Sequence, residues 1–354
     1  MLTLALIFGG RSAEHEISLA SARFVAAMLP PDRYRIVPVG ITRDGRWHCP
    51  DDIQAALDRG IEAVSGRRAR LDITPGQPAV VLSDGEHVPI DFAFPIMHGT
   101  YAEDGTIQGL LELTGVAYAG AGVAASAVGM DKELMKDIFA AHGLPQTEYL
   151  VLRDNSLDAA HAISAAEATL DYPMFVKPAN LGSSVGMTKA HSRPELVAGI
   201  ALAAQYDRKV IVERAVAGRE LECAVLGNES PRASVAGEVL PANEYYDFEA
   251  KYTDGMMQFI VPADIGTTRQ KEIGDLATAA FAAVDCSGYA RCDFFLEDSG
   301  RVLINEINTI PGMTRTSGFP RLWAASGVGS EALIESIVEL GLQRHAVRHR
   351  LQTT

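Results

Sequence analysis

The chain has 354 residues, 47% of them hydrophobic and 21% charged, and its formal net charge is −14. This length exceeds one ordinary hydrophobic core, so we expect two or three domains of a globular protein. The negative charge argues against a broad nucleic-acid surface, and no stretch reaches the length of a membrane-spanning helix, so we expect neither partner. The four cysteines are scattered without metal-type spacing, which indicates reduced thiols in a cytoplasmic protein.

The first predicted element is an apolar strand over residues 2–8, which lacks the basic flank and cleavage site of a signal peptide. It runs through Gly9 and Gly10 into a helix whose apolar stripe begins at Ile17. Strand, glycine turn and helix open an α/β domain, in which ligands bind at the carboxyl ends of strands. Glu16 lies near the start of the helix, where a dipole-favoured acid and a functional acid are about equally supported.

A later strand over residues 91–97 ends at His98, beside glycines and the acidic pair Glu103 and Asp104. A single loop histidine is more often structural, but its place at a strand end favours ligand contact. The stretch 120–125 matches a dinucleotide fingerprint only loosely, because the preceding strand is very short and no acid stands at the ribose distance. We interpret it as a domain junction.

A lysine, Lys177, ends the apolar strand over residues 172–178, where it needs an anionic partner. The following loop contains Ser183 and Ser184 between glycines, and its N–H groups and hydroxyls can cover phosphates. The alternative is a plain hairpin turn. Glu213 ends a later strand and Glu220 begins the next, so the pair can accept hydrogen bonds from an adenine amino group and ribose hydroxyls. Taken singly, each is more often a surface charge.

A polar and aromatic stretch over residues 243–255 lies between two predicted strands and contains Lys251 and Tyr252. Long loops of this kind are often functional, and Lys251 and Tyr252 could close over a phosphate. The alternative is a loop without a role.

The strongest motif is a predicted hairpin, in which Asp293 lies on the first strand and Glu306 and Asn308 on the second. Glu306 and Asn308 are two residues apart and therefore share one face of their strand. Three oxygen ligands without a nearby histidine or thiol suit Mg²⁺. Arg291 adds a cation that can meet a transferring phosphate. The alternative is an ordinary solvated hairpin.

Together these motifs resemble the ATP-grasp superfamily, and specifically the D-alanine–D-alanine ligases, nearly from end to end. In this order they are highly specific, although each alone is weak. The motifs that carry the resemblance are Gly9–Gly10, Glu14–Ser18, His98–Gly99 with Glu103–Gly105, Asp131–Lys132, Val176–Pro178, Gly182–Gly186, the Glu213/Glu220 pair, Tyr246–Tyr252, Arg291–Asp293 and Asn305–Thr309.

The resemblance implies an α/β protein with a three-domain ATP-grasp fold and an N-terminal domain built on an open parallel sheet. We expect an N-terminal substrate domain over residues 1–121, a central ATP-grasp domain over 122–214 and a C-terminal catalytic domain over 215–354. The implied activity is ATP-dependent ligation of two D-alanines through an acylphosphate, for peptidoglycan precursors. We also expect a cytoplasmic homodimer.

The resemblance implies two groups of ATP-site residues. Contacts to ATP are expected from Lys132, Lys177, Ser183, Ser184, Glu213, Glu220 and, at the transferred phosphate, Lys251. Two Mg²⁺ ions, which Mn²⁺ can replace, are expected on Asp293, Glu306 and Asn308.

The resemblance also implies how the amino acids bind. Glu16 takes the ammonium of the first D-alanine, with Ser183 and Tyr252 hydrogen-bonded to it, and His98 lies in the substrate site. Arg291 and the N–H of Gly312 stabilise the oxyanion. Ser317 takes the carboxylate of the second D-alanine.

The acceptor is the part of the prediction that remains most open. Gly318 follows Ser317 where the family commonly has a bulkier apolar residue, which could enlarge or loosen the acceptor pocket. A ligase that joins D-alanine to D-serine or D-lactate is therefore the alternative, and an ATP-binding regulatory protein with an inactive site is a third reading.

Overall fold

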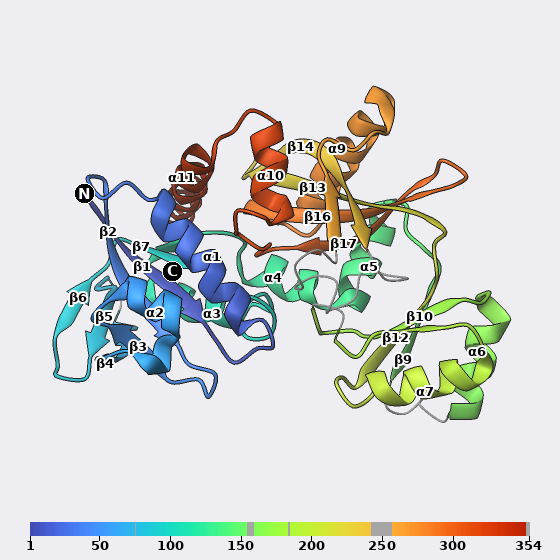
Figure 1. Ribbon diagram of the computed structural model, residues 1–354, viewed down its shortest axis with the longest axis horizontal. Coiled ribbons are helices and arrows are strands. Elements are labelled where there is room, and N and C mark those ends of the chain that lie inside the picture. The colour runs from blue at the N-terminus through green and yellow to red at the C-terminus, as the bar shows by residue number, and fades with distance from the viewer. Residues whose placement is uncertain (75, 154–158, 183–184, 242–256, 352–354) are drawn as a thin grey trace.

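The computed structural model describes residues 1–74, 76–153, 159–182, 185–241 and 257–351 (Figure 1). It contains three β-sheets, of eight, four and five strands, built from successive parts of the chain. Within these described ranges, no helix combines the length and apolar character needed to cross a membrane. All four cysteines are free thiols, and three of them are buried.

The N-terminal sheet has the strand order β6-β5-β4-β3-β2-β1-β7-β8. Strands β2, β1, β7 and β8 are parallel, whereas β3 to β6 extend the sheet in antiparallel fashion. The bounds are β1 (Leu2–Gly9), β2 (Tyr34–Ile41), β3 (Trp47–Pro50), β4 (Gly66–Leu71), β5 (Ala79–Leu82), β6 (His87–Pro89), β7 (Phe92–Pro95), β8 (Ala117–Tyr118), α1 (His15–Met28), α2 (Ile53–Arg59), η1 (Ile61–Ala63) and α3 (Thr106–Thr114). The sheet is therefore mixed, which corrects the predicted parallel sheet. The added strands are short, and such strands carry little periodic signal.

The central sheet has the order β11-β10-β12-β9 and is antiparallel throughout. Its elements are β9 (Tyr149–Arg153), β10 (Met174–Pro178), β11 (Thr188–Ala190), β12 (Lys209–Arg214), α6 (Ala159–Thr169) and α7 (Arg193–Ala203). One face buries Val176 and Val212 against Ile163 and Leu196 of the two helices. Lys177 and Glu213, two of the residues predicted to contact ATP, are next to these valines in sequence and therefore lie on the opposite face.

The third sheet has the order β15-β14-β13-β16-β17 and is also antiparallel. Its elements are β13 (Gly218–Gly227), β14 (Arg232–Pro241), β15 (Met257–Ile260), β16 (Gly288–Glu297), β17 (Val302–Asn308), α9 (Gly266–Ala283) and α10 (Gly318–Ala325). Helix α9 packs Ile273 and Phe281 against Cys292 and Ile304 of the hairpin β16–β17. The predicted hairpin is thus present, with one face covered by a helix.

Three helices join these parts. Helices α4 (Val123–Met130) and α5 (Lys132–Ala141) follow the N-terminal sheet, and α5 buries Met135 and Phe139 in the core of the third sheet. The final helix α11 (Ser330–His349) buries Leu333 and Ile337 in a core shared with the N-terminal sheet, and it contacts β8. Because α5 and α11 pack across the predicted boundaries, the division at residues 121 and 214 remains a prediction.

Candidate active site

The hairpin β16–β17 and the adjacent strand β13 bring the predicted metal-binding residues together. Asp293 lies opposite Glu306 and Arg291 lies opposite Asn308 in the ladder between the hairpin strands. On the other side of β16, Glu222 of β13 lies opposite Asp293. Directly opposed residues share one face of a sheet, so charged side chains from three strands meet on one surface.

Arg291 is fixed by acids on this surface. Its Nε and a terminal nitrogen each donate to one oxygen of Asp293 at 2.6 Å, and Nε lies 3.4 Å from Glu222 Oε1. A bidentate guanidinium–carboxylate pair constrains both groups geometrically. The proposed oxyanion-stabilising arginine and the proposed metal ligand are therefore held by each other.

A cleft lies between the third sheet and the central sheet, and it contains about 920 Å³ of empty space, part of it open to solvent. The central sheet contributes Lys177 and Glu213, and the third sheet contributes Glu220, Asp293 and Glu306. Phe175, Met187 and Phe295 add apolar surface. Apolar walls combined with a few convergent charged groups are typical of a small-molecule site.

A buried ion triplet forms one wall of the cleft. The Glu213 carboxylate lies 2.6 Å from Lys177 Nζ through one oxygen and 2.9 Å from Lys136 Nζ through the other. Burial opposes ionisation of Glu213, but the two ammonium groups outweigh it and lower its pKa to about 2. Burial also opposes the charge on Lys177, yet Glu213 raises the Lys177 pKa. For Lys136, burial prevails and the pKa is lowered.

Lys132 approaches the cleft from the start of α5. Its Nζ donates to the carbonyl of Leu181 at 2.8 Å, and Lys132, Leu181 and Gly182 all line the cleft. The beginning of the Gly/Ser loop therefore lies against this lysine. Ser183 and Ser184, which complete the predicted phosphate loop, fall outside the described residues, as do Lys251 and Tyr252.

His98 is buried and links three segments. Its Nδ1 lies 2.9 Å from the carbonyl of Ile310, and its Nε2 lies 3.0 Å from Ser21 Oγ. Burial opposes protonation of His98, but the neighbouring Glu103 outweighs it and raises the His98 pKa. Ser21 also accepts a hydrogen bond from the N–H of Met313 at 3.2 Å. His98 thus helps to hold the loop that carries Gly312.

The loop after β17 brings Gly312 and Ser317 together. A Cβ atom at Gly312 would stand 3.0 Å from Ser317 Oγ. The hydroxyl of Ser317 accepts a hydrogen bond from the N–H of Thr314 at 3.1 Å. At Gly318 a Cβ atom would stand 2.2 Å from Glu222 Oε2, so the space beside this glycine is filled by the carboxylate. The predicted enlargement of the acceptor pocket therefore finds no open space next to Gly318.

Glu16 lies apart from this cleft. It forms an ion pair with Arg43, its side chain is 68% exposed, and it does not line the cleft. Gly312, Ser317 and His98 do not line it either. Among the described residues, the structure therefore gathers six of the predicted nucleotide and metal residues in one cleft: Lys132, Lys177, Glu213, Glu220, Asp293 and Glu306. Asn308 and Arg291 do not line it.

Two residues of the cleft region were missed from the sequence. Glu222 is two residues from Glu220 on the same strand and so shares its face, a signal that period-two alternation could have given. Lys136 is four residues after Lys132 on one helix, which places both lysines on one side. Its burial could not be foreseen, because its partner Glu213 is distant in sequence.

The chemistry of the hairpin donors fits Mg²⁺. Asp293 and Glu306 are carboxylates and Asn308 is an amide, so all the donor atoms are oxygens. No group of three or more His, Cys, Asp or Glu side chains suited to a metal occurs in the described part of the chain. Two carboxylates are sufficient for Mg²⁺, which usually takes its remaining ligands from water and phosphate.

The sequence matches two family models. Residues 3–121 match the model described as D-ala D-ala ligase N-terminus, and residues 138–339 match the one described as D-ala D-ala ligase C-terminus. Among curated relatives, the D-alanine–D-alanine ligase of Halothermothrix orenii is 44% identical over 97% of this chain and 98% of the relative. The D-alanine–D-alanine ligase of Chloroherpeton thalassium is 45% identical over 98% and 97%, respectively.

Solved structures of the same kind superpose closely. The D-alanine-D-alanine ligase from Coxiella burnetii is 34% identical, has a TM-score of 0.87 and aligns over 99% of this chain and 96% of its own. The VanG D-Ala:D-Ser ligase from Enterococcus faecalis is 32% identical, has a TM-score of 0.89 and aligns over 96% and 99%. Backbone similarity alone therefore does not select between acceptors.

Replacing Glu213 by Gln tests the ion triplet. The change leaves two buried ammonium groups facing each other, and at pH 7 we expect a loss of unfolding free energy on the order of 3 kcal/mol. The native pKa of Glu213 is about 2 and its ordinary value is 4.5, so its contribution is complete above pH 4.5 and is lost as the pH falls towards 2.

Urea unfolding of the wild type and the variant at pH 7, 4 and 3 measures this effect. The difference in unfolding free energy between wild type and variant should become smaller as the pH falls. Glu148→Gln is the control, because Glu148 pairs with Arg214 at the surface and should change little. Equal stability of Glu213→Gln and wild type at pH 7 would contradict the account.

Proposed function

The chain belongs to the D-alanine–D-alanine ligase family, and we propose that it joins two D-alanines into D-alanyl-D-alanine while ATP is cleaved to ADP and phosphate. The dipeptide is a precursor of peptidoglycan. The observation that carries this function is one cleft in which Lys132, Lys177 and Glu213 face Glu220, Asp293 and Glu306. Cations for phosphates and oxygen donors for a metal stand there on opposite walls.

The reaction needs activation because a carboxylate is a poor electrophile. The γ-phosphoryl group moves from ATP to a carboxylate oxygen of the first D-alanine, and an acylphosphate and ADP result. The amine of the second D-alanine attacks the acyl carbon and loses a proton, and phosphate leaves with that carboxylate oxygen. Positioning and neutralisation of charge supply most of the catalysis in phosphoryl transfer.

Residues of the cleft have distinct tasks in this scheme. Lys132 and Lys177 bind phosphate oxygens, and Glu213 and Glu220 lie near the adenine and ribose. Asp293 and Glu306, with Asn308 on the same hairpin, would hold Mg²⁺, which would neutralise charge on the phosphates when bound. The ladder of the hairpin supports this assignment, because it places the Asp293 and Glu306 carboxylates at directly opposed positions.

The amino-acid residues act beyond the nucleotide. Arg291 and the Gly312 N–H face the oxyanion that forms during attack. Ser317 binds the carboxylate of the second D-alanine, and Glu16 binds the ammonium of the first. For Glu16 to do so, the ammonium must replace Arg43 as its partner, a modest cost for an exposed pair. The homodimer and the cytoplasmic location remain predictions.

An assay of products tests the function. Purified protein with ATP, Mg²⁺ and D-alanine should release ADP, phosphate and D-alanyl-D-alanine in equal amounts, quantified by chromatography and mass spectrometry. With D-alanine, D-serine and D-lactate present together, D-alanyl-D-alanine should dominate. A dominant product that contains D-serine or D-lactate would instead support the alternative acceptor. Absence of phosphate release at any D-alanine concentration would exclude both ligase functions.

Replacing Glu306 by Gln tests the metal assignment. The charged ligand is lost while the shape is nearly kept, so we expect kcat to fall by about 100-fold or more. Asp298→Asn is the matched control, because Asp298 lies exposed at the turn of the same hairpin and should retain normal turnover. Turnover of Glu306→Gln close to that of Asp298→Asn would refute the assignment.

A further inference from the structure

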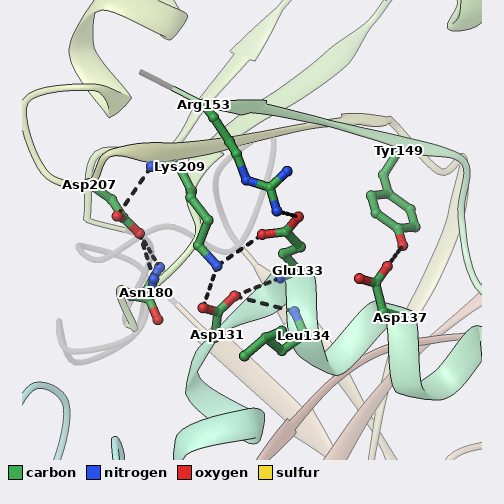
Figure 2. Close-up of polar contacts among 9 residues, drawn as sticks. All are labelled: Asp131, Glu133, Leu134, Asp137, Tyr149, Arg153, Asn180, Asp207 and Lys209. Atoms are coloured by element: carbon green, nitrogen blue, oxygen red, sulfur yellow. Dashed lines mark hydrogen bonds and ion pairs between the residues drawn. The ribbon is translucent and has the colours of Figure 1, made fainter. Parts of the chain in front are cut away.

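A second buried charge cluster lies beside the cleft, at the start of helix α5 (Figure 2). Its centre is Lys209, the first residue of β12, which is only 3% exposed. The Lys209 ammonium contacts an oxygen of Asp131 and lies 3.0 Å from Glu133 Oε2. Burial opposes the charge on Lys209, but these carboxylates outweigh it and raise the Lys209 pKa. Lys209 itself does not line the cleft.

Asp131 connects this lysine to the helix. It is the N-cap of α5, and its Oδ1 accepts hydrogen bonds from the N–H groups of Glu133 at 3.1 Å and Leu134 at 3.3 Å. Its other oxygen points to Lys209 (Figure 2). The helix dipole favours acids at this end, but two neighbouring buried carboxylates repel each other without a cation. Lys209 therefore makes this acidic helix start compatible with burial.

Backbone hydrogen bonds join the same junction to the Gly/Ser loop. The N–H of Ala179 donates to the carbonyl of Lys209, and the N–H of Lys132 donates to the carbonyl of Ala179, both at 3.0 Å. Asn180 donates through its backbone and side chain to one oxygen of Asp207, at 2.7 and 2.9 Å. The start of α5, the start of the loop and the start of β12 are thus fixed to one another.

Two residues that line the cleft lie next to these fixed segments in sequence. Lys132 is next to Asp131, and its ammonium reaches the carbonyl of Leu181 at 2.8 Å. Leu181 follows Asn180 and lines the cleft together with Lys132. A shift of the α5 start against the loop would therefore move the lysine and the loop backbone apart. Groups that bind a ligand together must be held close to their productive geometry, so such a shift weakens binding.

We propose that Lys209 is a positioning residue for the nucleotide. Its ammonium clamps the start of α5 against β12, to which Ala179 is hydrogen-bonded, so that Lys132 and the backbone of Leu181 and Gly182 meet the phosphates together. This inference rests on the proposed function only in taking ATP as the ligand. Arg153, which pairs with Glu133, is 54% exposed, so this ion pair contributes little to holding the start of α5.

The first test replaces Lys209 by Met and measures binding of MgATP calorimetrically without D-alanine, and then steady-state kinetics. We expect the Kd and the KM for ATP to rise about tenfold or more, which corresponds to about 1.4 kcal/mol. At saturating ATP, kcat and the KM for D-alanine should stay within about threefold of wild type. Lys209→Arg keeps the cation and should restore most of the affinity.

Two further variants separate positioning from general damage. Arg193→Met is the matched control, because it removes a cation from an exposed pair with Glu167 on the helices that cover the central sheet. The combined variant Lys209→Met/Asp131→Asn/Glu133→Gln leaves no unpaired buried charge and keeps an Asn cap, so it tests the clamp even where Lys209→Met folds poorly. This combined variant should also bind MgATP at least about fivefold more weakly than wild type.

Several results would overturn the proposal. One is a nucleotide affinity of the folded combined variant within twofold of wild type. Another is a loss of MgATP affinity in Arg193→Met equal to that in Lys209→Met. A third is a fall of kcat at saturating ATP in Lys209→Met as large as its loss of affinity. The proposed function fails separately: wild-type protein that binds MgATP without forming dipeptide would exclude the ligase but keep the clamp. Wild-type protein that binds no nucleotide would overturn both.

Discussion

The buried carboxylate of Glu213 is the interaction on which the rest of the site depends. It neutralises Lys177 of the central sheet and Lys136 of α5, a helix whose apolar side packs into the core of the third sheet. The central sheet and the third sheet have separate hydrophobic cores, and both therefore depend on the Glu213 carboxylate at the wall of the cleft. Buried ions are tolerated only when they are paired, so this pairing constrains how the sheets can face each other.

Helix α5 carries that constraint to a second place beside the cleft. Its first turn is held to the Gly/Ser loop through Asp131 and Lys209, and its second turn reaches Glu213 through Lys136. Opposite, the hairpin β16–β17 presents Asp293 and Glu306 at paired positions. Cationic and acidic walls are thus built on different sheets, and a phosphate–metal complex is the kind of ligand that can bridge them.

Much of this organisation could be predicted, and the failures have physical reasons. The hairpin was predicted because strand alternation and a Ser-Gly turn are local signals, and their ladder brings Asp293 opposite Glu306 as a consequence. The antiparallel strands β3 to β6 were missed because they are short. The triplet at Lys136 was missed because burial of a lysine depends on a partner 77 positions away. Likewise, the packing of α11 on the N-terminal sheet depends on long-range contacts that no local pattern encodes.

The central claim is that this cleft transfers a phosphoryl group to the carboxylate of D-alanine before the peptide bond forms. D-alanine labelled with ¹⁸O in its carboxyl group tests it most directly, with mass spectrometry of the phosphate released during dipeptide synthesis. The account predicts one labelled oxygen in each phosphate, because the acylphosphate breaks at the acyl carbon and leaves that oxygen on phosphorus. Dipeptide formation with unlabelled phosphate would contradict it.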